Sequence, residues 1–179
     1  MAEPSAPSVR PLRRPDATAF RATRLAALAA HPSCFGSSLQ EAEARPFRWY
    51  EEVAGSGRVL GWFDGAGALA GTAGLQVGGS LKTRHLGTLW GMYVVPGARR
   101  AGAGSALVEA ALALARPLVE EVRLTVASHN RAAVALYRRF GFEAYGLDLR
   151  ALKVGDAYVD ELLMRRVLAP DPRAPGPTA

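Results

Sequence analysis

The chain has 179 residues, of which 49% are hydrophobic, and its formal net charge is +6. This length and apolar content favour one folded domain and exclude a wholly disordered protein. The basic balance suits a polyanionic partner, either a nucleic acid or a phosphorylated cofactor. Because the arginines are spread along the chain without a basic tract and interleaved aromatic residues, we expect no specific nucleic-acid partner.

The two ends of the chain indicate the limits of the domain, and its single cysteine indicates the cellular compartment. Residues 1–7 and 169–179 are rich in Pro and Ala and are predicted to be disordered tails around one domain at residues 8–168. No apolar signal segment opens the chain, and no apolar run is long enough to cross a bilayer. Cys34 cannot form a disulfide within the chain, which suits a reducing compartment. We therefore predict a cytoplasmic protein with no membrane partner.

Hydrophobic periodicity in the first half predicts one strand, three helices and a hairpin. Asp16 is a good helix cap, and Asp64-Gly65 is a hairpin turn signal. The expected elements are a strand over residues 8–12, a helix from Asp16 to His31, shorter helices over 39–44 and 47–53, and strands over 58–63 and 69–77.

In the second half, strands and helices alternate. The expected elements are a strand over 86–95, a helix over 105–115, a strand over 122–126, a helix over 131–140 capped by Asn130, and strands over 149–154 and 158–166. This order predicts an α/β domain with a central mixed sheet, mostly antiparallel with a parallel pair near its middle, flanked by helices.

The most informative segment joins a strand to a helix through a glycine-rich turn. Val94-Val95-Pro96 is followed by Arg99-Arg100, Gly102 and Gly104, and then by a helical apolar pattern. The first turn of a helix has unpaired N–H groups and a partial positive charge, so it attracts anions. Glycines allow close approach of the backbone, and arginines add charge and donors. The segment therefore predicts an anion-binding loop.

Two familiar phosphate loops do not fit these residues. Gly97 and Gly102 have the Walker spacing, but Ala103-Gly104 replace the required Lys and Ser/Thr. In a dinucleotide fingerprint, Leu107 would occupy a position that needs a small residue. The pattern that remains is R-x-x-G-x-G.

A second pattern, N-x-x-A-x-x-x-Y-x-x-x-G-F, runs from Asn130 through Tyr137 to Phe142. Seven residues separate Asn130 from Tyr137, close to two helical turns, so both side chains lie on similar faces. By itself this pattern could be an N-cap and a packed tyrosine. Together with V-x-P-x-x-R-x-x-G-x-G, it resembles the GNAT superfamily of N-acetyltransferases over about residues 8–168.

The resemblance implies the GNAT-like acyl-CoA N-acyltransferase fold, with acetyl-CoA as cosubstrate and no metal. It implies transfer of the acetyl group to a primary amine by direct attack in a ternary complex. The backbone of Met92, Tyr93 and Val94 would pair with the pantetheine arm, and one of its N–H groups would polarise the acetyl carbonyl. Asn130 would bond the pantetheine amides, and Tyr137 would act at the departing sulfur. The implied pyrophosphate loop is Arg99, Arg100, Ala101, Gly102, Ala103, Gly104 and Ser105.

The proton transfers are less well defined by the sequence. Transfer of a proton from a tyrosine to a thiolate is uphill by roughly 2 kcal/mol at reference pKa values, so Tyr137 needs a lowered pKa or acts by hydrogen bonding. Thr125 stands where relatives that acetylate ribosomal N-termini carry a glutamate, so the general base is open. Candidates are Glu41, Glu43, His85, Asp160 and Glu161. A water chain or an acceptor amine of low pKa would remove the need for a base.

Two other functions remain possible at this point. One is a non-catalytic acyl-CoA-binding regulatory domain that uses the same loop, although such a domain needs no tyrosine at the sulfur. The other is a basic nucleic-acid-binding protein, recognisable by salt-dependent DNA binding. The amine acceptor can be a small molecule, a peptide or a protein. An exposed final strand would allow a homodimer.

Overall fold

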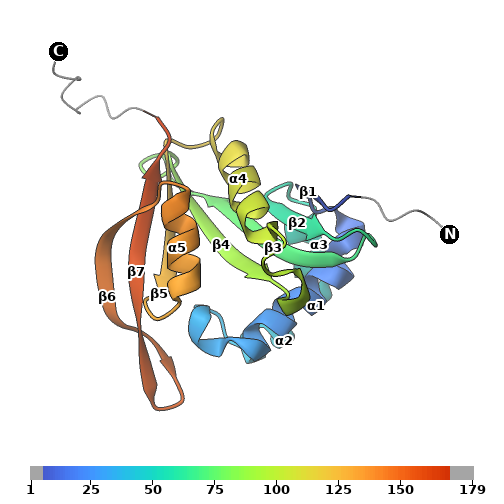
Figure 1. The fold of residues 1–179 in the computed structure, drawn as a ribbon, viewed down its shortest axis with the longest axis horizontal. Helices are drawn as coiled ribbons and strands as arrows, with labels where there is room; N and C mark the ends of the chain where they lie inside the picture. Colours follow the sequence, from blue (N-terminus) through green and yellow to red (C-terminus); the bar gives the residue numbers. More distant parts are fainter. Residues whose placement is uncertain (1–5, 170–179) are drawn as a thin grey trace.

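The computed structural model describes residues 6–169, so residues 1–5 and 170–179 of the expected tails lie outside the described part. Figure 1 labels the elements along the chain. They are β1 (Ser8–Pro11), η1 (Arg14–Asp16), α1 (Ala17–Ala30), η2 (Pro32–Cys34), α2 (Leu39–Ala44), α3 (Phe47–Ala54), β2 (Val59–Phe63), β3 (Leu69–Val77), β4 (Leu86–Val94), η3 (Pro96–Ala98), α4 (Ala103–Ala115), β5 (Glu121–Ala127), α5 (Arg131–Arg139), β6 (Glu143–Val154) and β7 (Ala157–Val167).

The strands form one seven-stranded sheet in the order β1-β2-β3-β4-β5-β7-β6. Every neighbouring pair is antiparallel except β4 and β5, which run parallel at the centre. A parallel pair needs a crossover connection, and α4 supplies it. The predicted mixed, mostly antiparallel sheet with flanking helices is therefore confirmed.

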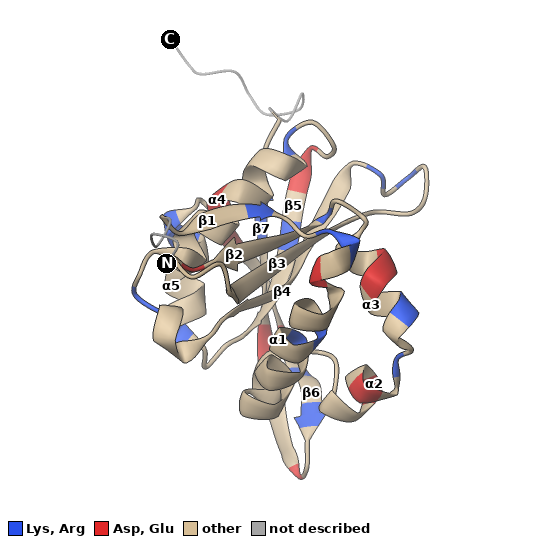
Figure 2. Ribbon diagram, turned by 90° about the vertical axis from the view of Figure 1, so that its right-hand side faces the viewer, with Lys and Arg blue, Asp and Glu red and all other residues tan. Residues whose placement is uncertain are grey.

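Helices cover both faces of the sheet, which gives the domain two apolar layers. Figure 2 shows α4 and α5 on one side of the sheet and α1 and α3 on the other. On the first side, Leu107 of α4 is fully buried in a cluster with Leu124 and Met164. On the second, Phe20 of α1 packs edge-to-face against Tyr50 of α3. Burial on both faces explains why β2 reads as a continuous apolar run.

One expected helix cap and two expected boundaries are wrong, for local reasons. Asp16 does not cap α1 with its side chain; it accepts from the backbone N–H of Arg13 and pairs with Arg10, both at 2.7 Å, because the chain enters the helix through the turn η1. Helix α4 begins at Ala103 rather than at residue 105. Strand β6 begins at Glu143 rather than at residue 149, since this edge strand is exposed along most of its length and lacks an apolar alternation.

No helix within residues 6–169 is both long enough and apolar enough to span a membrane.

Helix α2 is held by a capping box at its start. The Ser38 hydroxyl accepts from the backbone N–H of Glu41 at 3.1 Å, and the Glu41 carboxylate accepts from the backbone N–H of Ser38 at 2.8 Å. We expect Ser38→Ala to lower the free energy of unfolding by about 1 kcal/mol. Denaturant unfolding measures this loss. The control is Ser37→Ala, at the residue before the cap. Equal stability of the two variants would contradict a capping role.

Candidate functional site

A cleft opens at the middle of the sheet because its two central strands diverge. β4 and β5 pair only where Leu86–Thr88 face Glu121–Arg123. Beyond Thr88 the strands separate, as Figure 1 shows, and the cleft between them has a volume of about 1350 Å³. The edge of β4 that faces the cleft therefore has backbone groups without a strand partner, and such an edge can accept an added extended segment.

A β-bulge in β4 turns the backbone at the floor of this cleft. Thr72 pairs with Tyr93 and Gly74 with Trp90, so two residues of β4 oppose one of β3. One of the two is Gly91, whose φ of +61° favours glycine, and its carbonyl accepts a hydrogen bond from the Thr72 hydroxyl at 3.0 Å. Sequence reasoning missed Gly91, although a glycine inside an apolar strand is a signal for a bulge.

The glycine loop forms one wall of the cleft at the start of α4. Gly102 is the N-cap residue with a φ of +81°, and Arg100 also has a positive φ of +65°. The first N–H groups of α4 therefore lie at the cleft, where an anion can approach them. An added Cβ on Gly104 would lie 3.3 Å from Leu136 of α5, so glycine allows close packing of the two helices.

Most of the predicted site residues are brought together here. Those that line the cleft are Met92, Tyr93, Val94, Arg99, Arg100, Gly102, Gly104, Ser105, Asn130 and Tyr137. Ala101 and Ala103 do not line it: the first is exposed to solvent, and the second is buried in the core.

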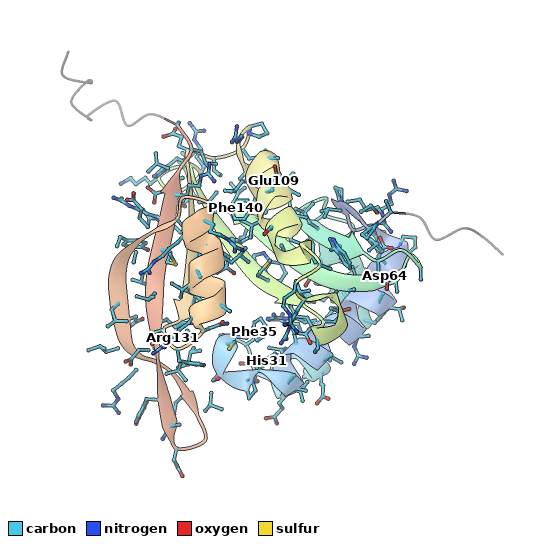
Figure 3. All side chains as sticks on the ribbon, viewed as in Figure 1. His31, Phe35, Asp64, Glu109, Arg131 and Phe140 are labelled. Atoms are coloured by element: carbon cyan, nitrogen blue, oxygen red, sulfur yellow. The ribbon has the colours of Figure 1, made fainter. Side chains whose placement is uncertain are left out.

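The cleft is electropositive. Arg99, Arg100, Arg131 and Arg139 line it, and no Asp or Glu does so within residues 6–169. Arg99 donates to the backbone carbonyl of Val94 at 3.0 Å and lies 2.9 Å from Nε2 of His31. Because a guanidinium only donates, this contact places the proton of a neutral His31 ring on Nδ1. Figure 3 shows His31 beyond α1, across from Arg131 at the start of α5.

Asn130 and Tyr137 both face the cleft from α5. The Asn130 side chain accepts from the backbone N–H of Ala133 at 3.2 Å, and its amide donates to the sulfur of Cys34 at 3.7 Å. Tyr137 is only 6% exposed and packs edge-to-face on Phe142. Burial raises the pKa of the Tyr137 phenol. The hydroxyl is therefore a poorer acid than an ordinary tyrosine and is better suited to donating a hydrogen bond.

A second cavity, of about 410 Å³, adjoins the cleft. Several residues line both spaces. Among them are Cys34 and Phe35 from the chain after α1, Trp90 and Gly91 of β4, and Thr125 of β5. Phe35, which lines both spaces, lies between α1 and α5 in Figure 3. Molecules in the two spaces would thus meet beside the Gly91 bulge.

Of the five candidate bases, only Glu161 lines either space. Glu161 lies on β7 next to β5, and Thr125 of β5 lines the same cavity. Burial is the main cause that raises the pKa of Glu161; Asp148, directly across on β6, raises it further, whereas Thr125 lowers it. A carboxylate from the neighbouring strand is thus brought beside Thr125.

The other candidates have different surroundings. Glu41 is engaged in the capping box of α2, and the Asp160 carboxylate accepts from the backbone N–H of Arg150 at 2.8 Å. Glu43 and His85 line neither space. Within the described part of the chain, no group of three or more His, Cys, Asp or Glu side chains is placed to hold a metal ion.

Comparison with solved structures shows a shared fold. An acetyltransferase of the GNAT family from Streptococcus pneumoniae aligns with a TM-score of 0.79 and 23% identity over 91% of this chain and 99% of its own. yncA from Salmonella typhimurium, solved with its cofactor acetyl-CoA, aligns with a TM-score of 0.79 and 20% identity over 94% and 99%. A phosphinothricin acetyltransferase from Sinorhizobium meliloti, in complex with acetyl-CoA, gives a TM-score of 0.76 and 20% identity over 92% and 89%.

Sequence comparison agrees with the fold. No curated protein matches this chain closely enough in sequence to indicate a shared function. The sequence model of the Acetyltransferase (GNAT) family, however, matches residues 24–142, which is more than half of the chain and contains both motifs. The expected resemblance is confirmed, and the chain belongs to the GNAT family of acetyltransferases.

Proposed function

We propose that this protein transfers the acetyl group of acetyl-CoA to a primary amine, which attacks the thioester directly in a ternary complex. The observation that carries the proposal is the junction at Gly91, where the cleft between β4 and β5 meets a second cavity that contains Glu161. Two substrates can reach one point from opposite sides. A binding domain that only holds acyl-CoA would have no use for the second cavity or for a carboxylate in it.

The cleft suits acetyl-CoA in shape and charge. The open edge of β4 over Met92, Tyr93 and Val94 offers backbone partners to the amides of a pantetheine arm. The first turn of α4 and the arginines around it suit a pyrophosphate. When bound, acetyl-CoA supplies an activated acetyl thioester. A backbone N–H group of β4 beside the bulge would polarise its carbonyl.

Two side chains manage the protons and the charge. Glu161 accepts the proton that the acceptor ammonium must lose before nitrogen can attack, since an alkyl amine is mostly protonated at neutral pH. Its raised pKa makes it a better base than an ordinary surface carboxylate. Tyr137, with a pKa that burial raises, donates a hydrogen bond to the departing sulfur rather than a proton.

Acetyl transfer itself is tested by incubating the protein with acetyl-CoA and a panel of primary amines and measuring thiol release. We expect release that depends on both substrates. Tight binding of acetyl-CoA without release for any amine would favour the non-catalytic regulatory domain instead.

The cofactor site is tested at the first turn of α4. We expect Gly104→Val to raise the Kd for CoA at least tenfold, or about 1.4 kcal/mol, because its branched side chain occupies the cleft where phosphate oxygens approach the helix N–H groups. Calorimetry measures the Kd, and thermal unfolding shows that the variant is folded despite the contact with Leu136. Gly97→Val is the control, because a Cβ there has no neighbour within 4 Å and Gly97 does not line the cleft. An unchanged Kd in folded Gly104→Val would refute the loop assignment.

A further inference from the structure

The second cavity contains a half-buried cation, one nitrogen of which is fully buried and has no partner within residues 6–169. Arg24 of α1 lines this cavity. Of the side-chain nitrogen and oxygen atoms buried within residues 6–169, its Nη1 alone has no hydrogen-bond partner. Arg24 also takes part in none of the ion pairs of those residues. Its guanidinium carbon lies 5.2 Å from the centre of the Phe35 ring.

A half-buried guanidinium with one buried, unpartnered nitrogen is costly for folding. Burial lowers the pKa of Arg24, and nearby Arg45 lowers it further, while Tyr50 opposes them; the group nevertheless stays charged at neutral pH. A buried charge without a counter-ion destabilises the folded state, so a hydrophobic residue would serve the fold better at this position. The arginine is therefore explained best by an anion that comes from outside the chain.

The positive and negative residues of the cavity come from different elements and form no ion pair with one another. Arg24 and Arg45 come from the α1 and α2 side, and Arg45 stacks over the Trp49 ring at 4.5 Å. Glu161 comes from β7 on the other side of the sheet centre. Such a cavity complements a molecule with an ammonium group at one end and an anionic group at the other.

We propose that the acceptor is a small amine that also carries a carboxylate or another oxyacid group, and that Arg24 binds this group. The inference rests on the proposed acetyl transfer and names its substrate class. The planar guanidinium matches a carboxylate, phosphinate or phosphonate with two parallel hydrogen bonds. A volume of about 410 Å³ suits a molecule of amino-acid size, and the walls from Phe35, Trp49 and Trp90 provide apolar contact for its side chain.

The position of Arg24 also limits the distance between the two groups of the acceptor. Nη1 of Arg24 lies 3.7 Å from the place that a Cβ on Gly91 would occupy, so the guanidinium is beside the bulge where the acetyl carbonyl is expected. An anionic group held there is only a few bonds from an amine that attacks at the bulge. An α-amino acid has this arrangement, whereas a peptide N-terminus has an amide in place of the carboxylate.

The test compares acids with their uncharged amides. The acids are the natural amino acids and phosphinothricin, and each is compared with its own carboxamide. For every compound, kcat/KM with acetyl-CoA is measured by thiol release. Wild-type protein is expected to prefer at least one acid over its carboxamide by tenfold or more, which is about 1.4 kcal/mol. Arg24→Gln should abolish this preference, and Arg24→Lys should keep part of it, because the charge remains without the planar fork.

Two controls separate binding of the anion from other roles. Arg21→Gln removes the same charge from the same helix at a residue that lines neither space, and it should keep the preference of the wild type. Arg24→Gln should bind acetyl-CoA with the Kd of the wild type and should unfold at the same or a higher temperature, because it removes an unpaired buried charge. A clear loss of stability would assign Arg24 a structural role and overturn the inference.

The remaining outcomes are distinct. Equal use of acids and carboxamides by the wild type, or acetylation of carboxamides alone, would overturn the anion site and leave acetyl transfer in place. Equal loss for both classes in Arg24→Gln would place Arg24 at the reacting carbonyl instead. Absence of thiol release with every amine would overturn the proposed function, and this inference with it.

Discussion

Replacing Glu161 with glutamine is expected to lower kcat about 10²- to 10⁴-fold at neutral pH, the range typical of a lost general base. The amide keeps the shape of the side chain but cannot accept the proton of the acceptor ammonium. Steady-state thiol release measures the loss. It should shrink at high pH, where the free amine forms without help, and with an amine of low pKa. Glu109→Gln on α4, which lines neither space, is the matched control and should be unaffected.

The pH profile gives this prediction a second readout. In the wild type, kcat should rise with pH as Glu161 loses its proton, and the rise should lie above the usual carboxyl range because burial raises this pKa. Asp148→Asn should move the rise to lower pH, since it removes the facing charge that favours the protonated form. The other ionisable groups in the cavity are Arg24, Arg45, Cys34 and Tyr50. A full kcat with an unchanged profile in Glu161→Gln would refute the assignment.

The free energy of unfolding of Glu161→Gln should show whether a low kcat comes from loss of the base or from loss of the fold. A raised folded-state pKa means that the native protein binds the Glu161 proton more tightly than the unfolded chain does. Stability therefore falls as the pH rises from the unfolded carboxyl value, about 4.3, through the folded-state value, and the full cost is present above it. At neutral pH, Glu161→Gln should consequently be at least as stable as the wild type in denaturant unfolding.

Tyr137→Phe is expected to lower kcat about 10²- to 10³-fold, as when one donor to a developing negative charge is removed. The Kd for acetyl-CoA should change little, because the hydroxyl acts mainly as the sulfur leaves. Since burial raises the pKa of Tyr137, the pH profile of the wild type should show no loss of activity from tyrosine ionisation below about pH 10. Single-turnover kinetics with calorimetry of acetyl-CoA binding measure both effects.

A matched substitution controls for the loss of a phenol elsewhere. Tyr145→Phe removes the hydroxyl of an exposed tyrosine on β6 that lines neither space, so it should retain the wild-type kcat. If Tyr137→Phe also retained full kcat under conditions where the chemical step limits the rate, Tyr137 would be a packing residue only.

The parts of the site that lie within one turn or one helix could be predicted from the sequence. The glycine loop was recognisable because a strand, two glycines and a helix start follow one another directly, and their geometry is local. Asn130 and Tyr137 were placed on one face by the helical repeat alone, and both line the cleft. The alternation of strands and helices likewise predicted a mixed sheet with a central parallel pair, which the pairing of β4 with β5 confirms.

The way in which distant segments complete the site could not be predicted from the sequence, because it depends on how the strands and helices pack. The divergence of β4 from β5 and the bulge at Gly91 depend on strand register, which neither strand carries in its own pattern. Glu161 comes beside Thr125 because β7 is inserted between β5 and β6, and Arg24 reaches the same cavity because α1 packs against β3 and β4. An arginine on a helix and a glutamate on a strand resemble surface charges in the sequence. Burial in the shared cavity shifts the pKa of both side chains, and burial is known only once the chain has packed.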